Sequence, residues 1–363
     1  MKNLLRTCAI ASVVLVLASL AHAQEGSTRA EFECLALANS SRVVAAGAPS
    51  PFVSFHHVWT PGINYGTFES NGLKLTYETQ GSGDEVVIVV HGGAGLPHEY
   101  FHPMLYNLSR YAKLVFFDRR ADMLSSRSGH GMASVDEMSD DIEALRKTLG
   151  LDRVTLLGHS FGATIALNYA LRHPANVKRL ILVSAAAWVE NPYEGEKRIL
   201  KTLSRVEMAA YRSSEDGTGA TRPCDRVRMR YSVLYKHYFH KLVPYEFNRG
   251  VYTVYFDALS RKEALASDST GLDVRAQLSE IQVPSLVFAG RYDPVTPPDQ
   301  SSELAAGLPH SRLVMMEHSG HFPFFEAYYL FTEWVRQFMA ATAGPHDDRT
   351  TRGPLTEASG GSH

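Results

Sequence analysis

The hydrophobic residues of this chain gather in short, unbroken runs that alternate with amphipathic stretches. Such a run predicts a strand that is buried on both faces, and these strands are typical of a parallel sheet covered by helices. The runs are Val86–Val90, Lys113–Phe117, Val154–Leu157, Leu180–Val183, Ser285–Phe288 and Leu313–Met315. Leu73–Tyr77 alternates instead, which predicts a strand with one polar face.

Helical patterns fill the intervals between these runs. Ser134 and Glu137 form a capping box, after which apolar residues recur at helical spacing until Gly150. Two further helices are predicted at Phe161–Arg172 and at Glu326–Thr342. Strands that alternate with helices in this way predict an α/β fold with a mostly parallel central sheet flanked by helices.

The alternation is lost between residues 188 and 277. A helical stripe in this region consists of Tyr231, Leu234, Tyr235 and Tyr238. We therefore expect a helical lid insertion at 188–277, between two parts of the core at 66–187 and 278–342. Residues 24–65 form an N-terminal extension of weak periodicity, and the polar segment 343–363 is predicted to be a disordered tail.

The first 23 residues predict a signal peptide. Lys2 and Arg6 form a positively charged region, which is followed by an apolar run at 8–20. The sequence AHA at 21–23 then offers a cleavage site before Gln24. The apolar run is short for a membrane span. We therefore expect a secreted or periplasmic protein with no stable membrane insertion after the signal is cleaved.

The overall composition is that of a globular chain, with 45% hydrophobic and 20% charged residues and a formal net charge of −2. The charges are balanced and show no run of Lys and Arg, which argues against nucleic acid as a partner. Loss of the signal peptide leaves the cysteines Cys34 and Cys224. In an oxidising compartment they form either a disulfide or two separate thiols, and the sequence leaves both alternatives open.

The strongest chemical signal is the sequence GHSFG at residues 158–162, which follows a predicted strand and leads into a predicted helix. A strand, a Gly-x-Ser-x-Gly turn and a helix in this order predict a nucleophile elbow, with Ser160 as the nucleophile. The backbone amide of Phe161, at the start of that helix, is then placed to bind a developing oxyanion.

A glycine-rich loop, HGGAG at residues 91–95, ends the strand predicted at 86–90. Its glycines let the backbone turn sharply and present an amide to the pocket, and we expect that of Gly93 to be the second oxyanion donor. His91 is expected to support the loop by hydrogen bonds rather than to take part in catalysis.

Two further strand ends supply an acid and a base. Asp293 and His321 each follow a predicted strand, and the chain order Ser, Asp, His is the one expected of a serine hydrolase with this topology. Asp293 would orient His321, and His321 would take the proton of the serine. His318 competes for the role of base, and Asp299 competes for that of acid, although Asp299 also fits the N-cap of the next helix.

Taken together, residues 65–342 resemble the α/β-hydrolases, and within them the prolyl aminopeptidase (proline iminopeptidase) branch. That branch carries a His-Gly-Gly-Pro-Gly oxyanion loop, in which Ala94 replaces the proline here. It also carries an Asp-Gln-Arg-Gly-x-Gly-Arg-Ser segment, of which Asp118, Arg120 and Ser125 remain while both glycines are lost.

The resemblance implies a fold with a lid and the release of an N-terminal residue, often proline, from a short peptide. It also implies that lid carboxylates bind the free amine of the substrate. The candidates for that role are Glu190, Glu194, Glu196, Glu207 and Glu246.

The predicted function is therefore that of an exported serine hydrolase that cleaves an ester or amide bond of a small molecule or short peptide. Three alternatives stay open: a carboxylesterase, lactonase or C–C bond hydrolase of small metabolites; an acyl transferase; and a pocket that binds a ligand without turnover. No cofactor or metal is implied, because no dinucleotide fingerprint occurs and the histidines lack a ligand motif. Those histidines are His56, His57, His98, His102, His237 and His240.

Overall fold

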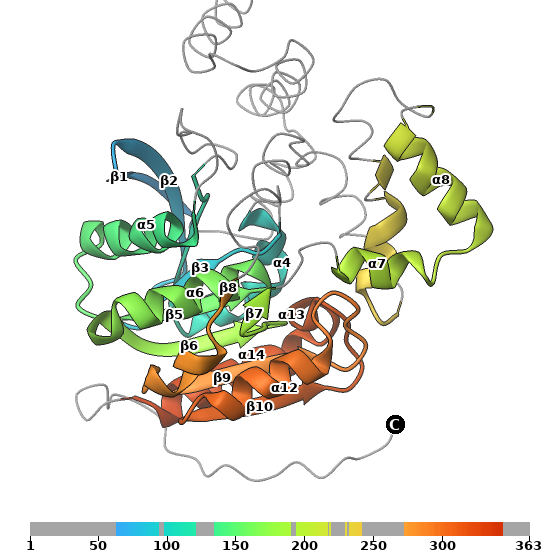
Figure 1. Cartoon of the computed structure of the whole chain (residues 1–363). Coiled ribbons are helices and arrows are strands. Elements are labelled where there is room, and N and C mark those ends of the chain that lie inside the picture. Colours follow the sequence, from blue (N-terminus) through green and yellow to red (C-terminus); the bar gives the residue numbers. More distant parts are fainter. Residues whose placement is uncertain are drawn as a thin grey trace, which may run out of the picture.

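An eight-stranded sheet forms the centre of the protein, which is described by a computed structural model (Figure 1). The structure describes residues 63–93, 98–120, 134–189, 194–216, 218, 229–230, 232–241 and 272–343. The predicted signal peptide, the two cysteines and the predicted tail after residue 343 lie outside these residues. So does all of the predicted extension except residues 63–65.

The strand order is β1-β2-β4-β3-β5-β6-β9-β10. Strands β1 and β2 run antiparallel to their neighbours, and all six others are parallel. The strands are β1 (Asn64–Ser70), β2 (Leu73–Gln80), β3 (Val86–Val90), β4 (Lys113–Phe117), β5 (Val154–His159), β6 (Val177–Val183), β9 (Ser285–Gly290) and β10 (Ser311–Met316). The mostly parallel sheet predicted from the apolar runs is confirmed.

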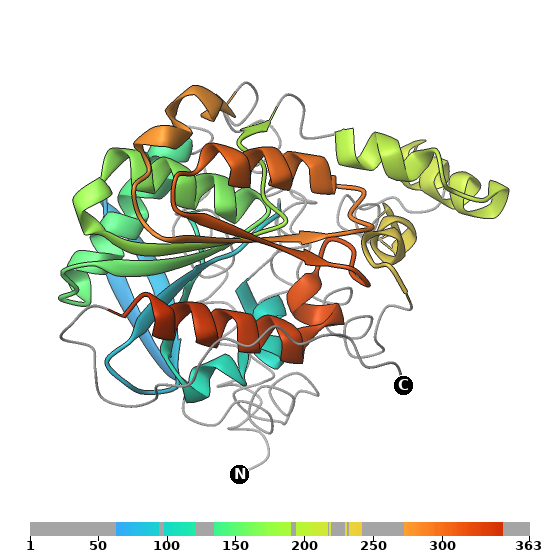
Figure 2. The same ribbon diagram turned by 90° about the horizontal axis from the view of Figure 1, so that it is seen from below.

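Helices cover both faces of this sheet (Figure 2). One face packs against α5 (Val135–Thr148), α6 (Phe161–Arg172) and α12 (Pro298–Gly307), and its apolar core includes Ile142, Ile165 and Leu304. The other face packs against α4 (His102–Leu105) and α14 (Tyr328–Ala341), and its core includes Phe101, Phe324 and Phe331. Covered faces explain why the parallel strands are apolar on both sides.

The helix boundaries follow from local chemistry. The capping box of Ser134 and Glu137 is confirmed, because the Ser134 hydroxyl accepts from the Glu137 amide and the Glu137 carboxylate accepts from the Ser134 amide. The last helix, predicted over about 326–342, is confirmed as α14 (Tyr328–Ala341), which begins two residues later than expected. A short helix, α13 (Pro323–Glu326), ends at Ala327, whose φ of −134° and ψ of 46° are not helical, and α14 begins after it.

The described part of the predicted lid region includes the helices α7 (Glu194–Leu200) and α8 (Arg205–Asp216). A short antiparallel pair of strands, β7 (Trp188–Val189) and β8 (Leu272–Asp273), joins the two ends of the region. In the predicted tyrosine stripe, residues 232–234 are helical and Tyr235–Tyr238 is a 3-10 helix. Whether α7 and α8 close over a substrate stays a prediction. None of the described helices has the length and apolar character needed to span a membrane.

Candidate active site

Ser160 lies in a sharp turn between β5 and α6. Its φ of 53° and ψ of −124° are unusual for a residue with a side chain and are a sign of local strain. The turn is held on both sides, because the Ser160 amide donates to the Val183 carbonyl (2.9 Å) and the Ser160 carbonyl accepts from the Ala163 amide (2.9 Å). This turn has the geometry predicted for the nucleophile elbow. At Ser160 the backbone leaves the extended conformation of β5.

Glycines on either side of Ser160 make the turn possible. A Cβ at position 158 would lie 2.6 Å from Cα of Ala163, and a Cβ at position 162 would overlap the carbonyl oxygen of Val90 at the end of β3. Both contacts involve backbone that cannot move aside easily. The glycines are therefore needed because α6 crosses the ends of β3 and β5 at close range.

Asp293 and His321 meet at the carboxyl ends of β9 and β10. His321 Nδ1 donates to Asp293 Oδ2 over 2.8 Å, and both side chains are buried. The other carboxylate oxygen of Asp293 accepts from the amides of Val295 (2.8 Å) and Thr296 (2.9 Å). An ionised carboxylate only accepts hydrogen bonds, so it fixes the proton of His321 on Nδ1 and leaves the Nε2 lone pair free to act as a base.

The two rival residues do not share this geometry. His318 is exposed, whereas His321 is buried. Asp299 is also exposed and lies in the first turn of α12, whose N-cap is Pro297, so the expectation that Asp299 caps this helix is wrong. Proline at the first helical position explains the shift, since it has no N–H to be capped.

Ser160 and His321 lie in the same region of the sheet edge. The ring of His159, next to Ser160, has its centroid 4.8 Å from that of His321. Between these two described residues, Ser160 and His321, the structure shows no hydrogen bond. Catalytic hydrogen bonds in ligand-free enzymes are often long and tighten only in the substrate complex.

A buried hydrogen-bond chain connects the loop after β3 to the loop of His321. The Gly92 amide donates to the Tyr100 hydroxyl (2.8 Å), and this hydroxyl is 2.8 Å from His159 Nδ1. His159 Nε2 is 2.9 Å from the His321 carbonyl oxygen. Only a ring N–H can bind a carbonyl, so His159 carries its proton on Nε2, and Nδ1 accepts from Tyr100.

Burial keeps the side chains of Tyr100 and His159 neutral. It raises the pKa of Tyr100 above its ordinary value, and burial followed by the nearby His321 holds the pKa of His159 well below its ordinary value. Sequence reasoning missed this role of Tyr100 and His159. The position of His159 inside the elbow was a signal that it would be buried, but nothing in the sequence pairs it with Tyr100.

Glu326 supports the loop of His321 from the other side. One carboxylate oxygen accepts from the Gly320 amide (2.6 Å) and the other from the His240 amide (2.7 Å). Burial raises the pKa of Glu326, against the effect of these backbone donors. The His321 amide donates to the Tyr238 carbonyl (2.7 Å), so the segment at 238–240 and Glu326 together hold His321 in place.

The predicted oxyanion donors lie at the ends of two adjacent strands. Gly93 adopts a φ of 61°, and its carbonyl accepts from Arg119 Nη2 at 2.7 Å, which fixes the peptide unit that follows Gly93. Phe161 opens α6, and the first amides of a helix have no acceptor within the helix. His91 is fully buried, and its Nε2 lies 3.5 Å from the Arg119 amide, a contact of the supporting kind expected for it.

The segment at 118–120 that resembles a prolyl aminopeptidase motif acts here as a scaffold. Arg119 holds Gly93, and Arg120 binds Asp141 on α5 through Nε (2.8 Å) and Nη2 (2.6 Å). Asp118 Oδ1 lies 2.7 Å from His98 Nδ1.

The candidate lid carboxylates are occupied where the structure describes them. Glu194 pairs with Lys197, Glu196 with Arg230, and Glu207 with Lys236. Glu190 and Glu246 lie outside the described residues. Each described candidate therefore already neutralises a cation of the protein, and none is shown to be reserved for a substrate amine.

Replacing Tyr100 with phenylalanine tests the hydrogen-bond chain. The change leaves a buried amide and a buried imidazole nitrogen without their partner, which costs about 1–3 kcal/mol. We expect kcat to fall by about tenfold with little change in KM, because the chain positions the site and does not touch the substrate. Tyr111→Phe alters an exposed tyrosine and is the matched control. An unchanged kcat in a folded Tyr100→Phe protein would show that the chain has no positioning role.

Comparison with known proteins agrees with this fold. The family described as the alpha/beta hydrolase fold matches residues 85–328. The chain is 30% identical over 264 residues to the AB hydrolase superfamily protein YisY of Bacillus subtilis, with 69% of this chain and 90% of that protein covered. It is 28% identical over 292 residues to a proline iminopeptidase of Saccharolobus solfataricus, with 75% of this chain and 90% of that protein covered.

Comparison with a solved structure also indicates the α/β-hydrolase fold. An esterase (EaEST) from Exiguobacterium antarcticum matches with a TM-score of 0.62 at 25% identity, over 76% of this chain and 98% of the esterase. The chain therefore belongs to the α/β-hydrolase family of enzymes, and proline iminopeptidases are among its relatives.

Proposed function

We propose that this enzyme is a serine hydrolase that cleaves an ester or amide bond of a small substrate, with Ser160, His321 and Asp293 as its catalytic triad. The observation that carries the proposal is the buried 2.8 Å hydrogen bond between His321 and Asp293, at the same sheet edge as the strained Ser160 turn. Each of these residues follows a strand of one sheet, which is how this fold assembles a site from distant segments.

The reaction follows from the protonation states. His321 Nε2 accepts the Ser160 proton as the hydroxyl oxygen attacks the substrate carbonyl, and Asp293 stabilises the imidazolium that forms. His321 then protonates the leaving group, which yields an acyl-enzyme. A water molecule, deprotonated by His321, attacks the acyl carbon, and the proton returns to Ser160 as the acid product leaves.

The amides of Gly93 and Phe161 are the proposed oxyanion donors. In the tetrahedral intermediates the carbonyl oxygen carries a negative charge, and one such donor contributes about 2.7–4 kcal/mol of transition-state stabilisation. Arg119 anchors the carbonyl of Gly93, which holds the loop beside the Gly93 amide, and the amide of Phe161 opens α6.

The proposal includes two possible classes of substrate, neutral esters and peptides with a free N-terminal residue. A neutral ester requires only the triad and the oxyanion donors, and the similarity to an esterase supports it. Release of an N-terminal residue is supported by the similarity to proline iminopeptidases. It also needs a carboxylate for the amine, and the described candidates are paired with cations of the protein. We therefore place ester hydrolysis first and prolyl aminopeptidase activity second.

The test is kcat/KM for p-nitrophenyl butyrate and for proline p-nitroanilide, measured on the wild-type protein and on Ser160→Ala. We expect turnover of the ester to exceed that of the prolyl amide, and both to depend on Ser160. A strong preference for the prolyl amide would reverse the order of the two classes. Turnover of neither substrate above the Ser160→Ala protein would contradict the assignment as a serine hydrolase.

A further inference from the structure

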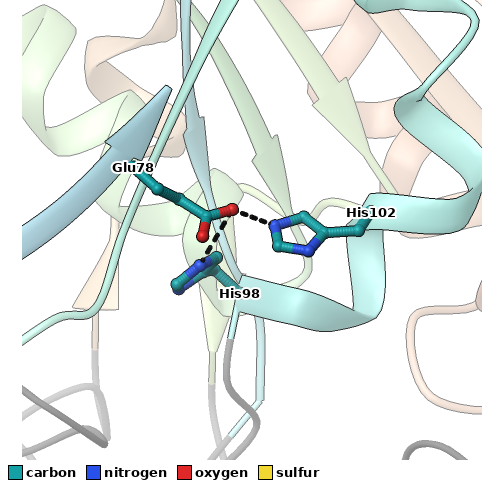
Figure 3. A group of neighbouring side chains, drawn as sticks. All are labelled: Glu78, His98 and His102. Carbon is teal, nitrogen blue, oxygen red and sulfur yellow. Dashed lines mark ion pairs between the residues drawn. The ribbon is translucent and has the colours of Figure 1, made fainter. Parts of the chain in front are cut away.

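A second cluster of chemically active side chains lies apart from the triad residues. It consists of Glu78 on β2, His98 in the 3-10 helix His98–Phe101 and His102 at the start of α4 (Figure 3). The two histidines are four residues apart, so successive helical turns bring them to one face. One donor atom from each of the three residues lies within 4.8 Å of the others.

The donor atoms converge on one point. Glu78 Oε1 is 3.4 Å from His98 Nε2 and also forms an ion pair with His102 Nε2. Two ligands of a tetrahedral zinc ion are separated by about 3.4 Å, given metal–ligand distances near 2.0–2.1 Å. The Glu78–His98 pair has this separation, whereas Glu78 and His102 are in direct contact and must move apart to admit the ion. Figure 3 shows the carboxylate and both rings directed toward this point. Two imidazole nitrogens and one carboxylate oxygen are a donor set that suits Zn²⁺.

The cluster is buried away from bulk solvent. The exposed fractions of Glu78, His98 and His102 are 2%, 6% and 2%, and the Phe116 ring lies against both imidazoles, with centroids 5.9 and 5.0 Å away. Within the described part of the chain, Glu78 Oε1 is paired with the two imidazoles of the cluster. A buried charge is normally paired or bound to a metal ion.

The surroundings orient the first histidine as metal sites do. Asp118 Oδ1 is 2.7 Å from His98 Nδ1, and Thr76 Oγ1 donates to Asp118 Oδ2 over 3.5 Å. A carboxylate that accepts a hydrogen bond from the Nδ1–H group keeps the ring proton on Nδ1, so that the Nε2 lone pair is directed at the common point. The sequence of contacts from carboxylate to histidine to metal is a recurrent feature of zinc sites.

We propose that Glu78, His98 and His102 bind one Zn²⁺ ion, with Asp118 as the residue that orients His98. The fourth position is left for water. The ion would join the segment that follows the predicted oxyanion loop to strand β2, and so stabilise that region. The proposal departs from the expectation of no metal site, which rested on the lack of a ligand motif. Glu78 lies 20 residues before His98, and only the fold brings them together.

The test uses the purified protein without a histidine tag, stripped with EDTA and titrated with ZnCl₂ by calorimetry, with metal content measured by mass spectrometry. We expect one equivalent of zinc. At free zinc of a hundred times Kd, we expect a rise in Tm of about 5 °C. Co²⁺ in place of zinc should give the visible absorption of a tetrahedral site.

The zinc affinities of single-residue variants test whether the ion binds at this cluster. Glu78→Gln should weaken zinc binding about 100-fold, and Asp118→Asn about 10-fold, since orienting residues are worth 10–100-fold in affinity. His310→Gln removes an exposed histidine outside the cluster and should leave the affinity unchanged. The proposal is overturned if the wild-type protein binds no zinc and its Tm does not respond. It is also overturned if Glu78→Gln binds as tightly as the wild type. If Glu78→Gln does not fold, the wild-type titration and Asp118→Asn still decide.

Discussion

Replacing Ser160 with alanine is expected to lower kcat for an ester substrate by about a millionfold, the effect of losing the nucleophile in other serine hydrolases. The substitution removes only a hydroxyl that has no hydrogen bond to His321, and alanine meets the same backbone strain at a φ of 53° as serine does. We therefore expect the Tm to stay close to that of the wild-type protein, so that the loss is chemical and not structural.

The matched control for this prediction is Ser279→Ala, which removes an exposed serine from the 3-10 helix Arg275–Glu280. The control should keep the wild-type kcat. Both proteins are assayed with p-nitrophenyl butyrate, and their Tm is measured by calorimetry. A Ser160→Ala protein that retains more than about a thousandth of the wild-type kcat would show that another group starts the reaction, because the oxyanion donors alone leave far less.

Asp293→Asn is expected to lower kcat by about 10⁴-fold at neutral pH, as in other triads. The amide can donate a hydrogen bond to Nδ1 of His321, which places the proton of the ring on Nε2. Nε2 is then unable to accept the proton of Ser160. The side-chain oxygen of asparagine can still accept from the amides of Val295 and Thr296, so the loop should keep its shape.

Asp299→Asn is the control, since this exposed residue in the first turn of α12 was the rival candidate for the acid. Its kcat should stay within about twofold of the wild-type value, as for most surface substitutions. If Asp293→Asn keeps kcat within tenfold while the protein is folded, the carboxylate does not orient the base and the triad is assigned wrongly.

The sequence predicts the core of this fold well because the signals are local. Apolar runs and a capping box depend on neighbouring residues only, and β3, β4 and α6 begin and end where the patterns place them. Strand β1 was missed because Asn64–Ser70 has few apolar residues and is an edge strand of mixed exposure. The start of the last helix was placed two residues early, because the apolar pattern continues through Ala327 while the backbone of Ala327, the N-cap of α14, is not helical.

The candidate site also contains residues that local sequence signals predict and residues that only the fold brings together. Ser160, Asp293 and His321 follow strand ends, and a motif or a chain order is enough to nominate them, although their catalytic roles stay predictions. Contacts between Tyr100 and His159, or between Glu78 and His102, join residues that are far apart along the chain. Spacing along the sequence does not encode these contacts, so they become visible only in the folded protein.

Labelling with a fluorophosphonate tests the central claim most directly, because this reagent reacts with a serine only when a neighbouring base has activated it. The wild-type protein should carry one adduct, located by peptide mass spectrometry on Ser160, and His321→Ala should react far more slowly. An unlabelled wild-type protein, or an adduct on another serine, would contradict the proposed catalytic triad.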